Sequence, residues 1–460
     1  MMQIIFSPYY MVCFILVLLF AALSSFYHKK SWSLPVAAVA ATTALWYLVE
    51  PVYTPETMAH FSPEITSQVY LTCAIFLIGF WIFFFLLKPM FAVRRHNLTR
   101  ETRLGLLSRQ KRERRQFEQI ARLALSVWAI LLLVGILRLN GDLAQALFPQ
   151  GGRFAPQMWS RAGASGAGAF GFAISLAGYV YTLLLASFGP LLILSRNRKL
   201  KVLLALAIAI SWPAVFLGGA RSAALFISVP MVVSFVLFGR ASPVQKALVS
   251  LISFLLIEFI FEVMIRTRNT GFSFDQLSGE FSTTHEGLNM ASELAWILQF
   301  IDNGSLTPNW GYRYFAELAN IVPRAIWPDK PLIGIDYAIL RGFESSTTDT
   351  GVSATVSTGM VGQGVVNFGQ IIGPLVAAFL IAIWANILTR LRSQGSTGRQ
   401  VLFMLGLALT INLGRDITLL VLFPFLFGYI FLSYIEARQA GINKRSKFAR
   451  RVSSIADPRL

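Results

Sequence analysis

Four arginines occur beside apolar segments, where a positive charge is unusual. Arg221 lies in the link GGARSAA, which is too short to be a free loop, and Arg415 lies in NLGRDIT. Arg266 and Arg268 follow an apolar segment directly. An arginine at membrane depth costs on the order of 2.5–3.5 kcal/mol even on lenient insertion scales, so it is functional by default. We therefore interpret these arginines as a group that meets at one mouth of a helix bundle.

Binding of a diphosphate is the chemistry that such a group would support. A guanidinium stays charged, forms bidentate hydrogen bonds to phosphate oxygens and is weakly hydrated. A diphosphate that leaves a sugar gains charge as the bond breaks, so arginines aimed at it would stabilise the transition state more than the ground state. The structural alternative is that Arg221 reaches toward the membrane surface and that Arg415 pairs with Asp416.

A long polar segment, residues 266–360, separates apolar regions and is not strongly basic. It holds ten acidic residues and His285, together with six basic residues that are candidates for substrate binding: Arg266, Arg268, Arg313, Arg324, Lys330 and Arg341. Three prolines stiffen its motif NIVPRAIWPDKP, which presents Arg324 and Lys330. Trp327 in the same motif is a candidate contact to a sugar face, with an interfacial anchor as the alternative.

Candidate general bases lie in the same segment, within STTHEGLNMASELAW. His285 is a candidate to deprotonate an acceptor hydroxyl, and Glu286 is its neighbour. The alternatives are that His285 is structural and that Glu286 completes a helix-capping box with Thr283. Further carboxylates of the segment remain open as the base: Glu280, Asp336 and Glu344.

Composition indicates a membrane protein. The chain has 460 residues, of which 55% are hydrophobic and 13% are charged, against roughly 25% charged in soluble proteins. The formal charge of +18 is explained better by the positive-inside rule than by nucleic-acid binding. Cys13 and Cys73 lie in apolar segments, and the sequence contains no HExxH motif, P-loop or DxD-like pair, so we expect neither a metal nor a cofactor.

Apolar segments of membrane-spanning length recur along the chain. We predict eleven spans over residues 8–26, 34–49, 69–91, 123–139, 166–194, 202–217, 223–238, 247–265, 368–388, 401–413 and 417–434. Strongly basic links then fall on the cytoplasmic side, which places the N-terminus in the periplasm and the C-terminus in the cytoplasm. The tenth span is short, and the Gly-rich segment 359–369 could count as a half-span.

This pattern divides the chain into four parts. Residues 1–265 hold the first eight spans, with a basic cytoplasmic loop at 94–122. Residues 266–360 form a periplasmic catalytic segment of short helices, 361–435 hold the last three spans, and 436–460 form a basic cytoplasmic tail.

The order of three motifs resembles one known family. GGARS at a tight outer link, VPRAIWPDKP in a large external segment and GMVGQGVVNFGQIIGP after it resemble bacterial oligosaccharide repeat-unit polymerases of the Wzy type. The resemblance runs from about Gly218 to Pro374. It implies an all-α, GT-C-like glycosyltransferase of the bacterial inner membrane. Such an enzyme joins undecaprenyl-diphosphate-linked repeat units on the periplasmic face without a nucleotide sugar or a required metal.

The resemblance also assigns roles and partners. It implies that Arg221, Arg266, Arg268, Arg324 and Arg415 bind the diphosphate or the acceptor. Membrane lipids and a polysaccharide chain-length regulator are the expected partners. Two alternatives stay open. An O-antigen ligase would use the same donor but transfer the glycan to lipid A core, and a flippase would move the lipid-linked units across the membrane.

Overall fold

The protein is a bundle of helices. The computed structural model describes residues 7–91, 103–149, 157–159, 169–217, 221–267, 289–319, 322, 326–327, 329–331, 335–342, 356–394, 396–418 and 422–438, apart from a few side chains within these ranges. Every regular element among these residues is a helix. The expected all-α class is therefore confirmed for the described part of the chain.

Eight described helices are long and apolar enough to cross a membrane. They comprise α2 (Pro8–Phe26), α3 with its extension (Ser33–Tyr53), α5 (Pro63–Phe91), α6 (Arg103–Arg138), α8 (Ala169–Leu194), α9 (Arg198–Leu217), α11 (Pro243–Thr267) and α15 (Met360–Gln394). Two shorter apolar helices, α10 (Arg221–Phe238) and α16 (Thr397–Leu413), pack beside them, and residues 422–438 form a further helix. These helices overlap the predicted spans, as expected of a polytopic membrane protein. The count of eleven spans and the GT-C-like fold stay predictions.

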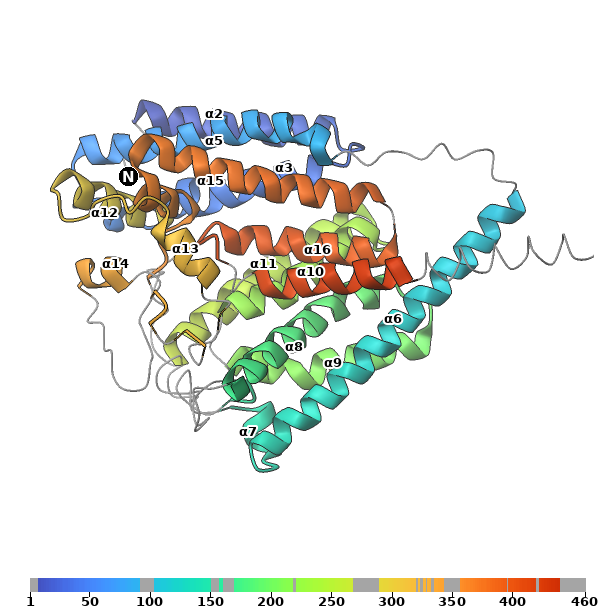
Figure 1. Ribbon diagram of the computed structural model, residues 1–460. Helices are drawn as coiled ribbons and strands as arrows, with labels where there is room; N and C mark the ends of the chain where they lie inside the picture. The colour runs from blue at the N-terminus through green and yellow to red at the C-terminus, as the bar shows by residue number, and fades with distance from the viewer. Residues whose placement is uncertain are drawn as a thin grey trace, which may run out of the picture.

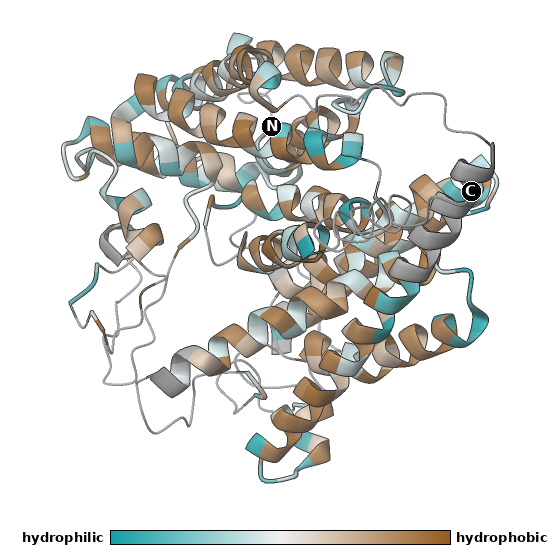
Figure 2. Cartoon of the chain, turned by 45° about the vertical axis from the view of Figure 1, so that its right-hand side comes forward, coloured by the Kyte–Doolittle hydropathy of each residue, from teal (hydrophilic) through white to brown (hydrophobic). Residues whose placement is uncertain are grey.

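The long helices pack in an order that differs from their order in the chain (Figure 1). α15 lies along α5, with α2 and α3 beside them. α16 contacts α3 and α15 on one side and α8 and α10 on the other, so it joins the two halves of the bundle. α6 and α9 cover α8. Hydrophobic residues dominate the outer faces of these helices as well as their contacts, as expected where lipid replaces water (Figure 2).

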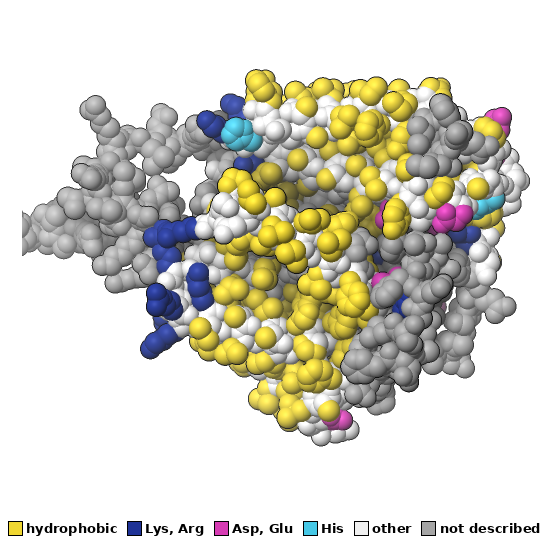
Figure 3. Space-filling view, turned by 180° about the vertical axis from the view of Figure 1, so that it is seen from behind, with side chains coloured by type: hydrophobic (Ala, Val, Ile, Leu, Met, Phe, Trp, Pro, Cys, Tyr) yellow, Lys and Arg dark blue, Asp and Glu magenta, His cyan; other side chains and the backbone are white. Residues whose placement is uncertain are grey.

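The two ends of the bundle differ in charge. Figure 3 shows Lys and Arg side chains gathered at one end, which we call the basic end, and the visible Asp and Glu side chains lying toward the other. Short helices occupy this second end: α7 (Leu143–Leu147), α12 (Met290–Asp302), α13 (Tyr312–Ala319) and α14 (Ile335–Leu340). We call it the α12–α14 end. It carries the described part of the polar segment 266–360.

A sharp reversal divides α15. Gly369 has φ 78° and ψ −178°, outside the helical region, and the chain folds back there. A Cβ added to Gly364 would lie 2.2 Å from the carbonyl oxygen of Gly373. In a continuous helix these two residues would be about 13 Å apart, so their contact requires a helical hairpin. The Gly-rich segment that the sequence places before the ninth span is thus a short, buried half-helix that packs against that span.

Substitution of Gly364 tests this close approach. We expect Gly364→Ala to lower the free energy of unfolding by about 1–3 kcal/mol, because the added methyl group overpacks against backbone that cannot rotate away. Thermal unfolding of the purified protein in detergent measures the change. Gly398→Ala is the matched control, since its Cβ would meet only the terminal methyl of Leu432. Equal melting temperatures for the two variants would contradict the hairpin.

Candidate functional site

Polar side chains converge at the α12–α14 end, where the turn after α16 meets the start of α15. Asp416 accepts hydrogen bonds at Oδ1 from the backbone N–H and the hydroxyl of Thr358, both at 3.1 Å. Gln363 brackets the same turn: its Oε1 accepts from the N–H of Ile417 at 2.9 Å, and its Nε2 donates to the Ile417 carbonyl at 3.2 Å. These contacts fix the turn 414–418 against the half-helix of α15.

Aromatic residues of the second predicted span pack against the turn 414–418 and the half-helix of α15. Residues Ala44–Val49 form a π-helix, a geometry that is often found at functional sites. Trp46 donates from Nε1 to the carbonyl of Ile411 at 2.9 Å, and the Tyr47 hydroxyl accepts from the N–H of Val361 at 3.1 Å. A Cβ on Gly414 would lie 2.3 Å from Trp46, so only glycine fits there. The span thus holds both the end of α16 and the start of the half-helix.

Arg415 is the charged residue at the centre of this arrangement. Its Nη2 donates to the Ser357 hydroxyl at 3.1 Å, while its Nε is buried and has no hydrogen-bond partner among the described residues. Burial lowers the pKa of the Arg415 guanidinium, and the negative charge of Asp416 opposes this shift. Burial likewise raises the pKa of Asp416, opposed by its hydrogen bonds and by Arg415. Among the described residues, Arg415 therefore has unused hydrogen-bonding capacity at Nε.

Helix α13 closes the site from the side of the polar segment. Asn367 of α15 accepts at Oδ1 from the N–H groups of Arg313 at 3.1 Å and Tyr314 at 3.3 Å, which fixes the first turn of α13. Further along, Glu317 accepts at Oε2 from the Thr418 hydroxyl at 2.6 Å. Through these two contacts α13 binds both the half-helix and the turn after α16.

The Tyr314 hydroxyl is a second buried polar group at this place. It has no hydrogen-bond partner among the described residues. Burial raises the pKa of Tyr314, and the negative charge of nearby Asp416 raises it further. We call the following set the Arg415 site: Tyr314, Ser357, Thr358, Gln363, Arg415 and Asp416. It combines a guanidinium, a phenol and a carboxyl group in a half-buried place.

A separate ion-pair cluster joins α12 to α14. Arg341 donates from Nε and Nη2 to the two carboxylate oxygens of Glu293, each at 3.2 Å, and the Tyr337 hydroxyl donates to the same carboxylate at 2.5 Å. The Arg341 guanidinium also lies 4.6 Å from the ring centroid of Trp296, and Arg313 lies 5.7 Å from that of Tyr337. Arg341 could therefore bind a phosphate only by giving up a bidentate ion pair.

The other described candidates also contact the protein. Arg266 forms an ion pair with Glu262 at 2.9 Å, and Lys330 donates to the Val322 carbonyl at 2.9 Å. The Trp327 ring packs edge-on against Phe315, with centroids 6.2 Å apart. These contacts hold the segment together, and the predicted substrate contacts of these residues stay predictions.

Eight predicted residues are not described in full. Arg268, Glu280, His285, Glu286, Arg324 and Glu344 lie outside the described residues. The side chains of Arg221 and Asp336 are not described, although their backbones belong to α10 and α14. The neighbourhood of Arg221 is nevertheless defined. Ala224, Met264 and Ile411 belong to one apolar cluster, so the start of α10, the end of α11 and the end of α16 meet. The helix ends that carry Arg221, Arg266 and Arg415 therefore lie at one end of the bundle.

Sequence reasoning missed several members of the Arg415 site. Gln363 and Asn367 were visible as polar residues inside an otherwise apolar, Gly-rich run, which is the usual sign of a functional position in a membrane. Tyr314 gave no such signal, because tyrosine is ordinary in a polar segment.

Comparisons of this chain with protein-family models, curated proteins and solved structures give no match. The function must therefore be argued from the site.

Proposed function

We propose that this protein is a glycosyltransferase of the bacterial inner membrane that polymerises undecaprenyl-diphosphate-linked oligosaccharide repeat units. The basic end of the bundle would face the cytoplasm and the α12–α14 end the periplasm, in line with the positive-inside rule. Eleven spans would then put the N-terminus outside and the C-terminus inside. Localisation of functional polar groups at one end favours chemistry on one face over transport, which would need charge along a path through the bundle.

The observation that carries this proposal is the buried Nε of Arg415, which has no hydrogen-bond partner among the described residues. A buried polar group without a partner needs an explanation, and the shielded Nε of Arg415 is such a group. A phosphate oxygen would supply the missing acceptor and a charge of the opposite sign. In a site shielded from water that interaction is stronger than at an exposed surface. The start of α10, which carries Arg221, lies near the end of α16, so Arg221 would add further positive charge for a diphosphate.

The proposed reaction is a single displacement at a sugar carbon. An acceptor hydroxyl of the incoming lipid-linked repeat unit attacks the anomeric carbon of the growing glycan. The new carbon–oxygen bond forms as the bond to the diphosphate oxygen breaks, and the electron pair leaves with the lipid diphosphate. The hydroxyl proton passes to a base, for which His285 and Glu286 are the candidates. Arg415 would stabilise the charge that develops on the diphosphate.

Reconstitution tests the proposal directly. We expect purified protein in detergent to convert synthetic undecaprenyl-diphosphate repeat units into a ladder of polymer lengths on a gel. Glycan transfer that occurs only after addition of lipid A core would contradict polymerisation and indicate a ligase. Movement of the lipid-linked unit across proteoliposomes without any covalent product would indicate a flippase.

A further inference from the structure

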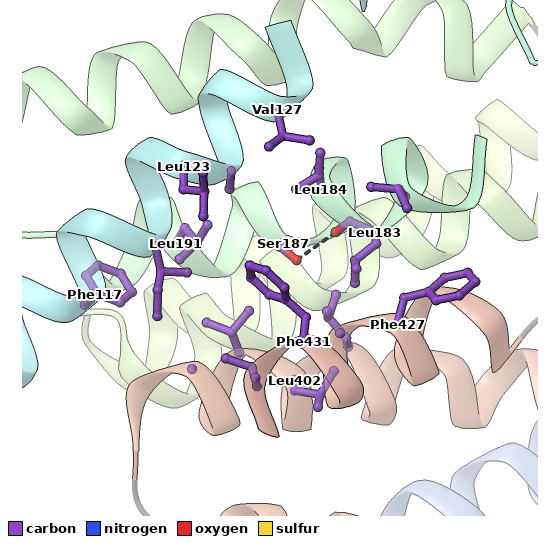
Figure 4. Close-up of a pocket in the computed structure, with 18 of the residues that line it drawn as sticks. Phe117, Leu123, Val127, Leu183, Leu184, Ser187, Leu191, Leu402, Phe427 and Phe431 are labelled. Carbon is purple, nitrogen blue, oxygen red and sulfur yellow. Dashed lines mark hydrogen bonds between the residues drawn. The ribbon is translucent and has the colours of Figure 1, made fainter. Parts of the chain in front are cut away.

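An apolar cavity of about 360 Å³ lies among the membrane-spanning helices, between α6, α8, α16 and residues 422–438 (Figure 4). Figure 4 shows Val127 of α6, Leu184 of α8 and Leu402 of α16 around it, with the ring of Phe431 across from Ser187. Its volume falls in the range of ligand pockets, about 300–1,000 Å³. It is thus large enough to hold part of a ligand.

The lining offers hydrocarbon and almost nothing else. Ser187 contributes the one side-chain hydroxyl among the lining residues, and that hydroxyl donates to the carbonyl of Leu183 at 2.7 Å. Gly398 and Gly428 add no side chain. A ligand with polar groups would lose hydrogen bonds to water and find none here, so the cavity suits a hydrocarbon chain.

The cavity is elongated along the bundle. Its lining on α8 runs from Leu176 to Leu191, which is about 22 Å of helix. That length is most of the roughly 30 Å hydrocarbon core of a bilayer. Only 11% of the apolar part of α6, Phe117–Arg138, is buried inside the protein. Figure 1 shows α6 running obliquely to the other helices. Most of α6 therefore faces outward, and its residues Phe117 to Val127 line the cavity from that side.

The same helix connects the cavity to the Arg415 site. Leu402 and Leu405 of α16 line the cavity, and α16 ends at Leu413, two residues before Arg415. Leu405 and Arg415 are about 15 Å apart along the helix direction. The lining residues on α16 are Gly398 to Leu405, in the half of the helix nearer the basic end. A lipid with its diphosphate at Arg415 would therefore extend its chain about 15 Å along α16 before it enters the cavity.

We propose that this cavity binds the polyprenyl chain of the lipid-linked substrate, an inference that rests on the proposed function. The chain would be held by α6, α8, α16 and residues 422–438 while its diphosphate rests at the Arg415 site. The enzyme would then discriminate substrates by the length of the lipid as well as by the sugar.

Photolabelling tests the cavity without requiring sugar transfer. The probe is a polyprenyl diphosphate that carries a diazirine in the chain and no sugar, irradiated with the purified protein in nanodiscs. We expect mass spectrometry to find the label on peptides of α6, α8, α16 and residues 422–438. Val127→Trp should reduce labelling about tenfold, because the indole fills the cavity.

The matched control is the same substitution on the same helix. Val134→Trp on α6 alters an exposed residue that does not line the cavity, and it should leave labelling unchanged. Ser187→Leu fills the cavity with a smaller group and should also reduce labelling if Val127→Trp fails to fold.

Several outcomes would overturn the inference. Label on other helices, equal labelling of the Val127 and Val134 variants, or equal competition by a phosphatidyl lipid would each do so, the last because it identifies a bilayer acyl chain as the occupant. The outcomes also separate the two proposals. Polymer formation with label elsewhere would overturn the cavity alone, whereas label in the cavity without polymer would overturn the proposed function alone.

Discussion

Arg415→Lys is expected to lower the rate of polymer formation by about 10²–10³-fold, the usual cost of losing one well-placed donor to a developing negative charge. Lysine keeps the positive charge but not the planar set of donors. The ammonium could replace the bond from Nη2 to Ser357, yet it would leave nothing at the position of the buried Nε. The ladder assay with purified, reconstituted protein measures the rate.

A matched variant separates catalysis from folding. Arg392 lies at the basic end and donates to the carbonyls of His28 and Lys30 and to the Ser33 hydroxyl. Arg392→Lys changes an arginine that makes more hydrogen bonds than Arg415 and lies far from the proposed chemistry, so it should retain the wild-type rate. If Arg415→Lys made the full ladder at the wild-type rate while remaining folded, Arg415 would have no role in the reaction.

Glu293→Gln is expected to cost about 3–5 kcal/mol in the free energy of unfolding, the typical result of breaking a buried ion pair on one side. Glu293 is only 7% exposed and binds both Arg341 and Tyr337. The amide would leave the Arg341 guanidinium without its countercharge. Denaturant titration in detergent micelles measures the loss, and α14 should detach from α12 first.

Two controls define this effect. Glu118→Gln removes a carboxylate whose ion pair with Arg122 spans 3.9 Å and involves an arginine that is 67% exposed, so we expect a change within about 0.5 kcal/mol. The double variant Glu293→Leu with Arg341→Leu removes both charges and should recover much of the lost stability. A cost for Glu293→Gln as small as that for Glu118→Gln would show that the cluster does not hold α14.

Hydropathy alone located most of the described helices. The spans predicted at 8–26, 202–217 and 223–238 agree with α2, α9 and α10 to within a few residues. Each is an uninterrupted apolar run that must satisfy its backbone hydrogen bonds internally, and a helix is the way to do so in lipid. Two unusual features of the predicted spans also occur in the structure. The tenth span is a short helix, and the Gly-rich segment is a separate half-helix.

The site was predicted less completely, because its members come together only in the folded chain. The sequence indicated Arg415 by its position between apolar segments, but its contacts with Ser357 and the neighbouring Tyr314 depend on residues 58 and about a hundred positions away. Arg341 and Arg415 have the same chemistry in the sequence. Their surroundings distinguish them. Glu293 forms an ion pair with Arg341, whereas the Nε of Arg415 has no hydrogen-bond partner among the described residues.

The sequence by itself determined the class of the protein, the length of its spans and the end of the bundle toward which its basic links point. These properties follow from local composition, since transfer of a segment into lipid depends on the residues of that segment. The tertiary structure decided which arginine is neutralised and which remains available. It also decided that a hydrocarbon-lined cavity forms between α6, α8, α16 and residues 422–438. Those outcomes depend on packing between distant helices, where a single carboxylate or glycine determines what a neighbouring side chain can still bind.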